Sequence, residues 1–180
     1  MLARAADSIL VIVDVQERLA AAMEAPALAG MKKNAGILIQ AAAALGIPVL
    51  ATEQYPKGLG RTVDEVAERI PQTIEKTCFS CAGAESFSGE LRRAGRAQIV
   101  LAGMEAHVCV LQSALDLHTM GFEVFVVADA CCSRRAENHR NAMERMRAAG
   151  VTVTNTESTV FEWLRDARHE QFKAVSALVR

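Results

Sequence analysis

The stretch Gln98–Gly121, QIVLAGMEAHVCVLQSALDLHTMG, decides the fold of this 180-residue chain. It opens with the apolar run Gln98–Ala102, breaks at Gly103, and continues as a helical pattern from Cys109 to Met120. A short run rich in Val and Ile is typical of a strand that is covered on both faces. Glycine commonly follows the last residue of a helix because it adopts left-handed dihedral angles easily. The stretch therefore predicts a strand, a glycine turn and a helix, in that order.

The same unit recurs along the chain. Further strands are predicted at 8–15, 47–52, 123–128 and 151–154, with a weaker one at 72–76. Helices that end at a glycine are predicted at 34–45, 87–94 and 137–149, with Met143 and Met146 in the core. A capping box of Thr159 and Glu162 predicts one more helix, and a C-terminal helix or arm is expected at 171–179. Alternating strands and helices predict an α/β fold: a single domain, 1–180, built as a three-layer α/β/α sandwich around a mostly parallel sheet of about six strands.

Composition excludes several classes of protein. The chain is 51% hydrophobic and has a formal net charge of -1, so neither intrinsic disorder nor a basic nucleic-acid-binding surface is expected. No apolar run approaches the roughly 18 residues of a membrane span, so no membrane partner is expected. The five cysteines are an odd number in a chain without an export signal. We therefore expect reduced thiols and a cytoplasmic location.

Three chemically important side chains follow three of the predicted strands: Asp14, Lys76 and Cys109. Open parallel sheets bind their ligands at the carboxyl ends of the strands, where these residues would meet. Taken singly, each has a purely structural alternative: a turn aspartate, a solvated lysine and an inert buried cysteine. A thiol in the first turn of a helix, however, is expected to have a lowered pKa. Together the three provide a nucleophile, a proton acceptor and a charge that stabilises an anion.

Five segments carry a resemblance to a known family. They are VDVQ at 13–16, ATEQYPKGLGRTV at 51–63, EKTCFS at 75–80, GMEAHVCV at 103–110 and VVADACCSR at 126–134. They resemble the isochorismatase-like cysteine hydrolase superfamily, in particular the isochorismatase domain-containing proteins. The resemblance implies a catalytic triad of Asp14, Lys76 and Cys109 and a cis peptide bond at Met104–Glu105. It also implies an oxyanion hole formed by the backbone N–H groups of Glu105 and Cys109.

Two differences between this sequence and other members of the superfamily limit the reactions that it can catalyse. Nicotinamidases of this superfamily carry metal-binding histidines after the second strand, whereas the first histidine of this chain is His107. We therefore expect no metal and no cofactor. Isochorismatases that cleave a vinyl ether lack the nucleophilic cysteine, so Cys109 favours a hydrolase for a small amide-like or other carbonyl compound, acting through a thioester. The alternatives are a non-catalytic oligomeric scaffold, or a thiol-redox protein that uses the CxxC pair Cys78 and Cys81.

Further residues are assigned by position only. Candidate walls of a substrate pocket lie near the carboxyl ends of the strands: Gln16, Glu53, Tyr55, Phe79 and His107. Cys131 and Cys132 are expected to pack under the loop after the fifth strand. The apolar arm 172–179 and the helix that carries His118 are expected to bury part of a subunit interface, which predicts a homo-oligomer, a dimer or larger.

Overall fold

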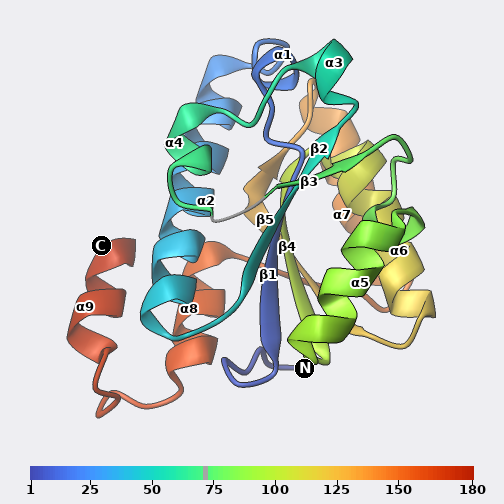
Figure 1. Ribbon diagram of the computed structural model, residues 1–180. Coiled ribbons are helices and arrows are strands. Elements are labelled where there is room, and N and C mark those ends of the chain that lie inside the picture. Colours follow the sequence, from blue (N-terminus) through green and yellow to red (C-terminus); the bar gives the residue numbers. More distant parts are fainter. Residues whose placement is uncertain (71–72) are drawn as a thin grey trace.

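The computed structural model describes residues 1–70 and 73–180 and contains one six-stranded sheet (Figure 1). The strands lie in the order β3-β2-β1-β4-β5-β6, and every neighbouring pair is parallel. Their bounds are β1 (Ser8–Val13), β2 (Val49–Gln54), β3 (Thr73–Lys76), β4 (Gln98–Met104), β5 (Glu123–Cys132) and β6 (Thr152–Thr154). The predicted α/β class and strand number are confirmed. Gln72, which the sequence placed in the third strand, lies outside the described residues.

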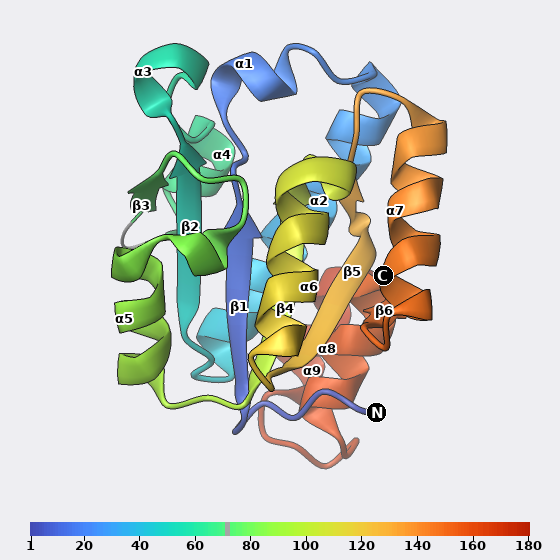
Figure 2. The same ribbon diagram turned by 90° about the vertical axis from the view of Figure 1, so that its right-hand side faces the viewer.

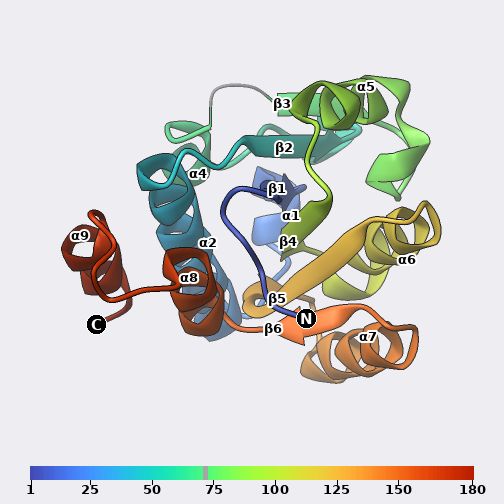
Figure 3. The ribbon, with the colours of Figure 1, turned by 90° about the horizontal axis from the view of Figure 1, so that it is seen from below.

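Helices cover both faces of the sheet. One face carries α2 (Ala25–Ala44), α8 (Thr156–Leu164) and α9 (Phe172–Ser176), and the other carries α5 (Glu85–Ala94), α6 (Leu111–Thr119) and α7 (Ala136–Ala148) (Figure 3). Figure 2 shows α5, α6 and α7 side by side in front of the strands. Three helices of four residues each, which are too short for a periodic pattern, were not predicted: α1 (Glu17–Ala20), α3 (Pro56–Leu59) and α4 (Asp64–Ala67).

The central strand β1 explains why the sheet forms. All six of its residues are buried, and their side chains alternate between the two faces. Leu10 and Ile12 belong to the apolar core under α2, whereas Ile9 and Val11 belong to the core under α5 and α6. Full burial of each such side chain stabilises the fold by about 1.5–3 kcal/mol. Met143 and Met146 lie in the second core, as predicted.

Two predictions about the C-terminal half were wrong. Helix α8 begins at Thr156, because the Asn155 side chain accepts a hydrogen bond from the N–H of Ser158 at 2.8 Å and caps the helix four residues before the predicted cap, Thr159. Strand β5 extends to Cys132, so Cys131 and Cys132 are buried within the strand and not under a following loop. The strand is longer than its apolar pattern because its pairing with β4 shifts register around residues 127–130.

The C-terminal arm packs on its own domain. Val175 is fully buried, and Phe172, Leu178 and Val179 are half-buried against the core of the α2 face. Figure 3 places α9 on the opposite face of the sheet from α6, the helix that carries His118. The arm and α6 are therefore two separate surfaces of the subunit, and the subunit interface that the sequence suggested stays a prediction. Among the described residues, no helix combines the length and hydropathy needed to cross a bilayer.

Candidate active site

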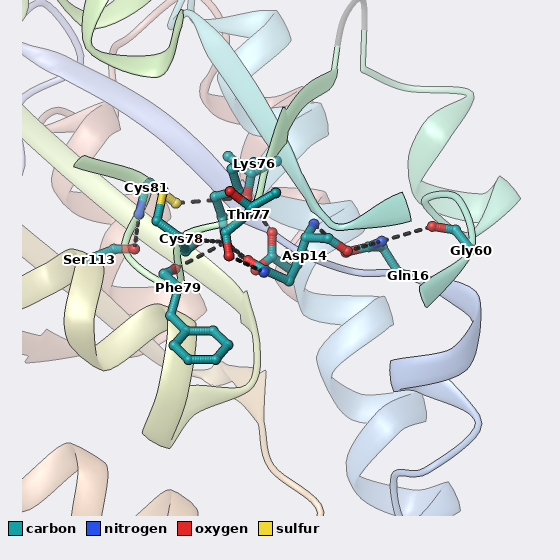
Figure 4. Close-up of polar contacts among 11 residues, drawn as sticks. Asp14, Gln16, Gly60, Lys76, Thr77, Cys78, Phe79, Cys81 and Ser113 are labelled. Atoms are coloured by element: carbon teal, nitrogen blue, oxygen red, sulfur yellow. Dashed lines mark hydrogen bonds and ion pairs between the residues drawn. The ribbon is translucent and has the colours of Figure 1, made fainter. Parts of the chain in front are cut away.

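A buried ion pair lies at the carboxyl edge of the sheet (Figure 4). The Lys76 ammonium donates to Asp14 Oδ2 at 2.7 Å, and both side chains are 0% exposed. Asp14 directly follows β1 and Lys76 ends β3, so the pair bridges across the intervening strand β2. Two buried charges are stable only when hydrogen bonds satisfy them both. The contacts around the pair therefore decide what it can do.

Carbonyl oxygens complete the environment of the ammonium. Lys76 Nζ donates to Gln54 Oε1 at 2.8 Å, to the carbonyl of Phe79 at 3.0 Å and to the carbonyl of Cys78 at 3.2 Å. Burial is the largest influence and would lower the pKa of Lys76, but the charge and hydrogen bond of Asp14, together with Cys81 and Cys109, outweigh it, and the pKa lies above its ordinary value. Lys76 is therefore a fixed cation at neutral pH.

The carboxylate is held from the other side by β2. Thr52 Oγ1 donates to Asp14 Oδ1 at 2.7 Å, and the N–H of Asp14 donates to the carbonyl of Thr52 at 3.1 Å. Asp14 has a φ of 50°, the left-handed region that aspartate tolerates better than most residues. The chain thus turns sharply at the end of β1, and the Asp14 carboxylate meets both Thr52 and Lys76.

The segment that leads from β4 to Cys109 has an unusual backbone. Gly103 has a φ of 124°, and a Cβ there would lie 2.2 Å from the carbonyl oxygen of Val13, so only glycine lets β4 pass this close to β1. The peptide bond Met104–Glu105 is cis. A π-helical segment, Ala106–Val110, then precedes α6 and carries Cys109.

Glu105 is fixed through its carboxylate and its carbonyl. Glu105 Oε1 accepts from Arg134 Nε at 2.9 Å, and the Glu105 carbonyl accepts from the N–H groups of Val108 and Val110. Within residues 1–70 and 73–180, the N–H of Glu105 donates to no protein acceptor. This donor is therefore free for a ligand, as an oxyanion hole requires.

The Cys109 thiol is 4% exposed, and its environment differs from the one predicted. Burial raises the pKa of Cys109, and the neighbouring Asp14 carboxylate raises it further, while Lys76 acts in the opposite direction. The predicted lowering of this pKa was wrong, because burial and the neighbouring aspartate raise it. Burial and Asp14 thus favour the protonated thiol over the thiolate. Asp14 is the adjacent group that can accept the proton.

Two of the five predicted pocket residues form hydrogen bonds that hold neighbouring loop segments in place. The Gln16 amide donates to the carbonyls of Gln54 and Gly60, at 3.1 and 2.8 Å. Glu53 accepts from the N–H and hydroxyl of Thr62 and from Arg61. Burial tends to raise the pKa of Glu53, but these hydrogen bonds leave it below the ordinary value. Because alternate strand residues point to opposite faces, Glu53 points away from the ion pair that Gln54 contacts.

The other three lie nearer the surface. Tyr55 is 54% exposed and lines a cavity of about 520 Å³, together with Lys76, Thr77 and Cys78. The Phe79 ring is 52% exposed, and only its carbonyl contacts the ion pair. His107 is half-buried, and its ring lies 3.0 Å from Ser133 Oγ and 3.3 Å from Asn138 Nδ2. Of the five candidates, Tyr55 lines this cavity, whose described walls include Lys76 but not Asp14 or Cys109.

Sequence reasoning missed a second thiol at the site, in Cys81. This residue is fully buried, its sulfur lies 3.7 Å from Thr52 Oγ1, and its N–H donates to Ser113 Oγ at 2.8 Å. Burial raises the pKa of Cys81 to about 11. A redox CxxC motif needs an accessible thiol with a lowered pKa, so the environment of Cys81 argues against that alternative.

Comparison with known proteins agrees with this architecture. Residues 8–158 match the family model described as the isochorismatase domain. The mouse isochorismatase domain-containing protein 2A is 37% identical over 179 residues, which cover 96% of this chain and 82% of that protein. The solved structure of MAR1 ribonuclease from Caenorhabditis elegans is 34% identical with a TM-score of 0.92, covering 99% of this chain and 92% of that one. YcaC from Pseudomonas aeruginosa, solved with hexane-2,5-diol and covalent acrylamide, is 28% identical with a TM-score of 0.90, covering 98% and 91%. The chain belongs to the isochorismatase domain family.

Proposed function

We propose that this protein is a cysteine hydrolase that needs no metal and acts on a small amide-like or other carbonyl compound through a thioester. One observation carries the proposal: a buried thiol lies beside a buried carboxylate–ammonium pair. Cys109 is the nucleophile, Asp14 the general base and acid, and Lys76 the cation that stabilises negative charge as it moves between them.

The reaction has two halves. Cys109 Sγ attacks the carbonyl carbon while its proton passes to Asp14, and the oxyanion accepts hydrogen bonds from the N–H groups of Glu105 and Cys109. When the intermediate collapses, the amine leaves with the proton from Asp14, and a thioester remains on Cys109. Water, deprotonated by Asp14, then attacks the thioester carbon, the C–S bond breaks to release the acid, and Asp14 returns the proton to the Cys109 sulfur. In other acyl-transfer enzymes, each oxyanion-hole donor is worth about 10²–10³ in rate.

The proposed reaction takes its positive charge from a side chain. Among the described residues, no three histidine, cysteine, aspartate or glutamate side chains lie together in a way that would hold a metal ion. The ammonium of Lys76 is already placed as the local cation. The chemistry proposed above requires no cofactor.

The size of the substrate follows from burial. Cys109 is 4% exposed and Asp14 is fully buried, so a small molecule reaches them far more easily than a polymer. Acrylamide, which is covalently bound in the Pseudomonas aeruginosa relative, is a compound of the proposed size and class. The Caenorhabditis elegans relative is named a ribonuclease. Because the chain has a net charge of -1 and the Cys109 thiol is buried, we propose no nucleic-acid substrate for it.

The experiment measures ammonia release from a panel of small primary amides, with the wild-type protein, Cys109→Ala and Cys131→Ala. Cys131 is a matched control because it is also a buried free thiol but lies in β5. We expect turnover of at least one amide by the wild type and Cys131→Ala, and none by Cys109→Ala. If the Cys109→Ala variant still hydrolyses an amide, Cys109 is not the nucleophile. If the wild-type protein hydrolyses none of the amides and forms no covalent adduct with them on Cys109, the result favours the non-catalytic scaffold.

A homo-oligomer remains part of the proposal, with the C-terminal arm and α6 as candidate contact surfaces between subunits. A stable interface should bury more than about 1,000 Å² in total. Sedimentation that shows a monomer at micromolar concentration would contradict it without affecting the triad.

A further inference from the structure

Gln54 links the ammonium of Lys76 to the loop that follows β3. Its side-chain Oε1 accepts from Lys76 Nζ at 2.8 Å, and its Nε2 donates to the carbonyl of Thr77 at 2.6 Å. Gln54 is 8% exposed and ends β2, the strand between Asp14 and Lys76. It is therefore a side chain that contacts the triad without belonging to it.

The backbone of Gln54 is held separately from its side chain. Its N–H donates to Gln16 Oε1 at 2.7 Å, and its carbonyl accepts from Gln16 Nε2 at 3.1 Å. The parallel pairing of Gln54 with Lys76 extends the ladder between β2 and β3. A change of the Gln54 side chain therefore leaves the local backbone with its own hydrogen bonds. This separation makes the role of the amide testable.

The side chain at position 54 is a neutral amide and not a carboxylate, and this affects the electrostatics around Lys76. The ammonium has three N–H donors, and the acceptors around it are the Asp14 carboxylate and three neutral carbonyl oxygens, one of which is the Gln54 amide. Neutral acceptors fix the position of the ammonium without cancelling its charge. The charge of Lys76 therefore remains available when negative charge moves from Asp14 to the Cys109 sulfur. A second carboxylate at position 54 would remove that advantage.

We infer that Gln54 is a positioning residue, whose amide holds the Lys76 ammonium where it stabilises the Cys109 thiolate; the inference rests on the proposed function. The amide does not touch the reacting atoms and acts only through Lys76. Its contribution is therefore visible in how readily Cys109 becomes a nucleophile and disappears when Lys76 is absent.

The experiment follows alkylation of Cys109 by acrylamide from neutral to alkaline pH, with peptide mass spectrometry to separate Cys109 from the other four cysteines. We expect Gln54→Met to slow alkylation of Cys109 about tenfold at a given pH, which corresponds to an upward shift of about one pKa unit. Gln54→Glu, which keeps the shape of the side chain, should also slow it, because its carboxylate competes for Lys76. Gln112→Met, a change of an exposed glutamine in α6, should leave the rate unchanged.

A double-mutant cycle decides whether the effect passes through Lys76. We expect Lys76→Met to slow alkylation of Cys109, and Gln54→Met to add less than a further twofold in that background. An equal slowing in both backgrounds, or wild-type rates in the single Gln54 variants, would overturn the inference and leave the proposed function intact. Lys76→Met alkylated as fast as wild type would overturn both. Thermal melting of each variant, and unchanged protection of the buried Cys131, confirm that the variants are folded.

Discussion

Two buried polar clusters lie at opposite ends of the central strands. At the amino ends of β1 and β4, Trp163 Nε1 donates to Ser8 Oγ at 3.0 Å, and Ser8 Oγ lies 3.4 Å from Gln98 Oε1. At the carboxyl ends lie Asp14 and Lys76, with the Cys109 thiol beside them. We call the first group the amino-end cluster and the second the triad.

Both clusters are as deeply buried as the apolar core, so burial of polar groups does not by itself identify a functional site. The amino-end cluster contains neutral hydrogen-bonding groups that tie α8 to the sheet. The triad contains two full charges and a thiol, a combination that costs more to bury and that packing alone does not require. The difference between a structural and a functional cluster therefore lies in the kind of group that is buried.

The largest expected effect on stability is at the triad. Lys76→Met leaves the Asp14 carboxylate buried without its counter-charge, which should reduce the free energy of unfolding by about 3–5 kcal/mol, measured by urea denaturation. The double variant Asp14→Asn/Lys76→Met removes both charges and should regain most of that loss. A double variant as unstable as the single one would mean that shape, and not charge, dominates this site.

A smaller effect is expected at the amino-end cluster. Ser8→Ala leaves the indole N–H of Trp163 buried without its acceptor, at a cost of about 1–3 kcal/mol in the free energy of unfolding. Trp163 is the only tryptophan, so its fluorescence reports the transition directly. The rate of acrylamide addition to Cys109 should stay within twofold of wild type. A large change in that rate would mean that the two clusters are coupled.

The smallest effect is expected at Glu53, on the face of β2 that points away from the triad. The pKa of Glu53 is below its ordinary value of 4.5, so its contribution to stability is complete above that value and is lost as the pH falls through the lower, folded-state value. Glu53→Gln should therefore flatten the acid side of a plot of unfolding free energy against pH. The Glu53→Gln change should not alter turnover at neutral pH. A loss of turnover would mean that Glu53 lines the substrate pocket after all.

Much of the fold could be predicted because it depends on local patterns. The Val- and Ile-rich runs predicted the strands. Helix α5 ends directly before Gly95, and α7 ends at Ala148, two residues before Gly150. The first turns of α2 were missed because Ala25–Lys33 shows no clear apolar stripe. The register shift in β5 was missed because it arises from pairing with β4. Local sequence does not encode such pairing.

The triad could be placed, but its environment could not. Asp14, Lys76 and Cys109 follow strand ends, and the carboxyl-edge rule brings such residues together. Thr52 and Gln54 contact the ion pair only because β2 lies between β1 and β3, and strand order is not visible in a single sequence. The pKa of Cys109 was misjudged for the same reason: burial and the approach of Asp14 belong to the folded state.

Transfer of an acyl group to Cys109 tests the central claim most directly. The protein is mixed with p-nitrophenyl acetate, quenched in acid at intervals and digested for mass spectrometry, alongside Asp14→Asn, Lys76→Met and Cys109→Ala. If the three residues act as one catalytic unit, an acetyl group appears on Cys109 of the wild type and is then lost by hydrolysis. Acetylation of Cys109 is slower in Asp14→Asn and Lys76→Met. In Cys109→Ala, no acetyl group forms on residue 109. Acetylation that occurs at Cys78 or at surface lysines and not at Cys109, or that reaches Cys109 equally fast without Asp14 and Lys76, would contradict the account.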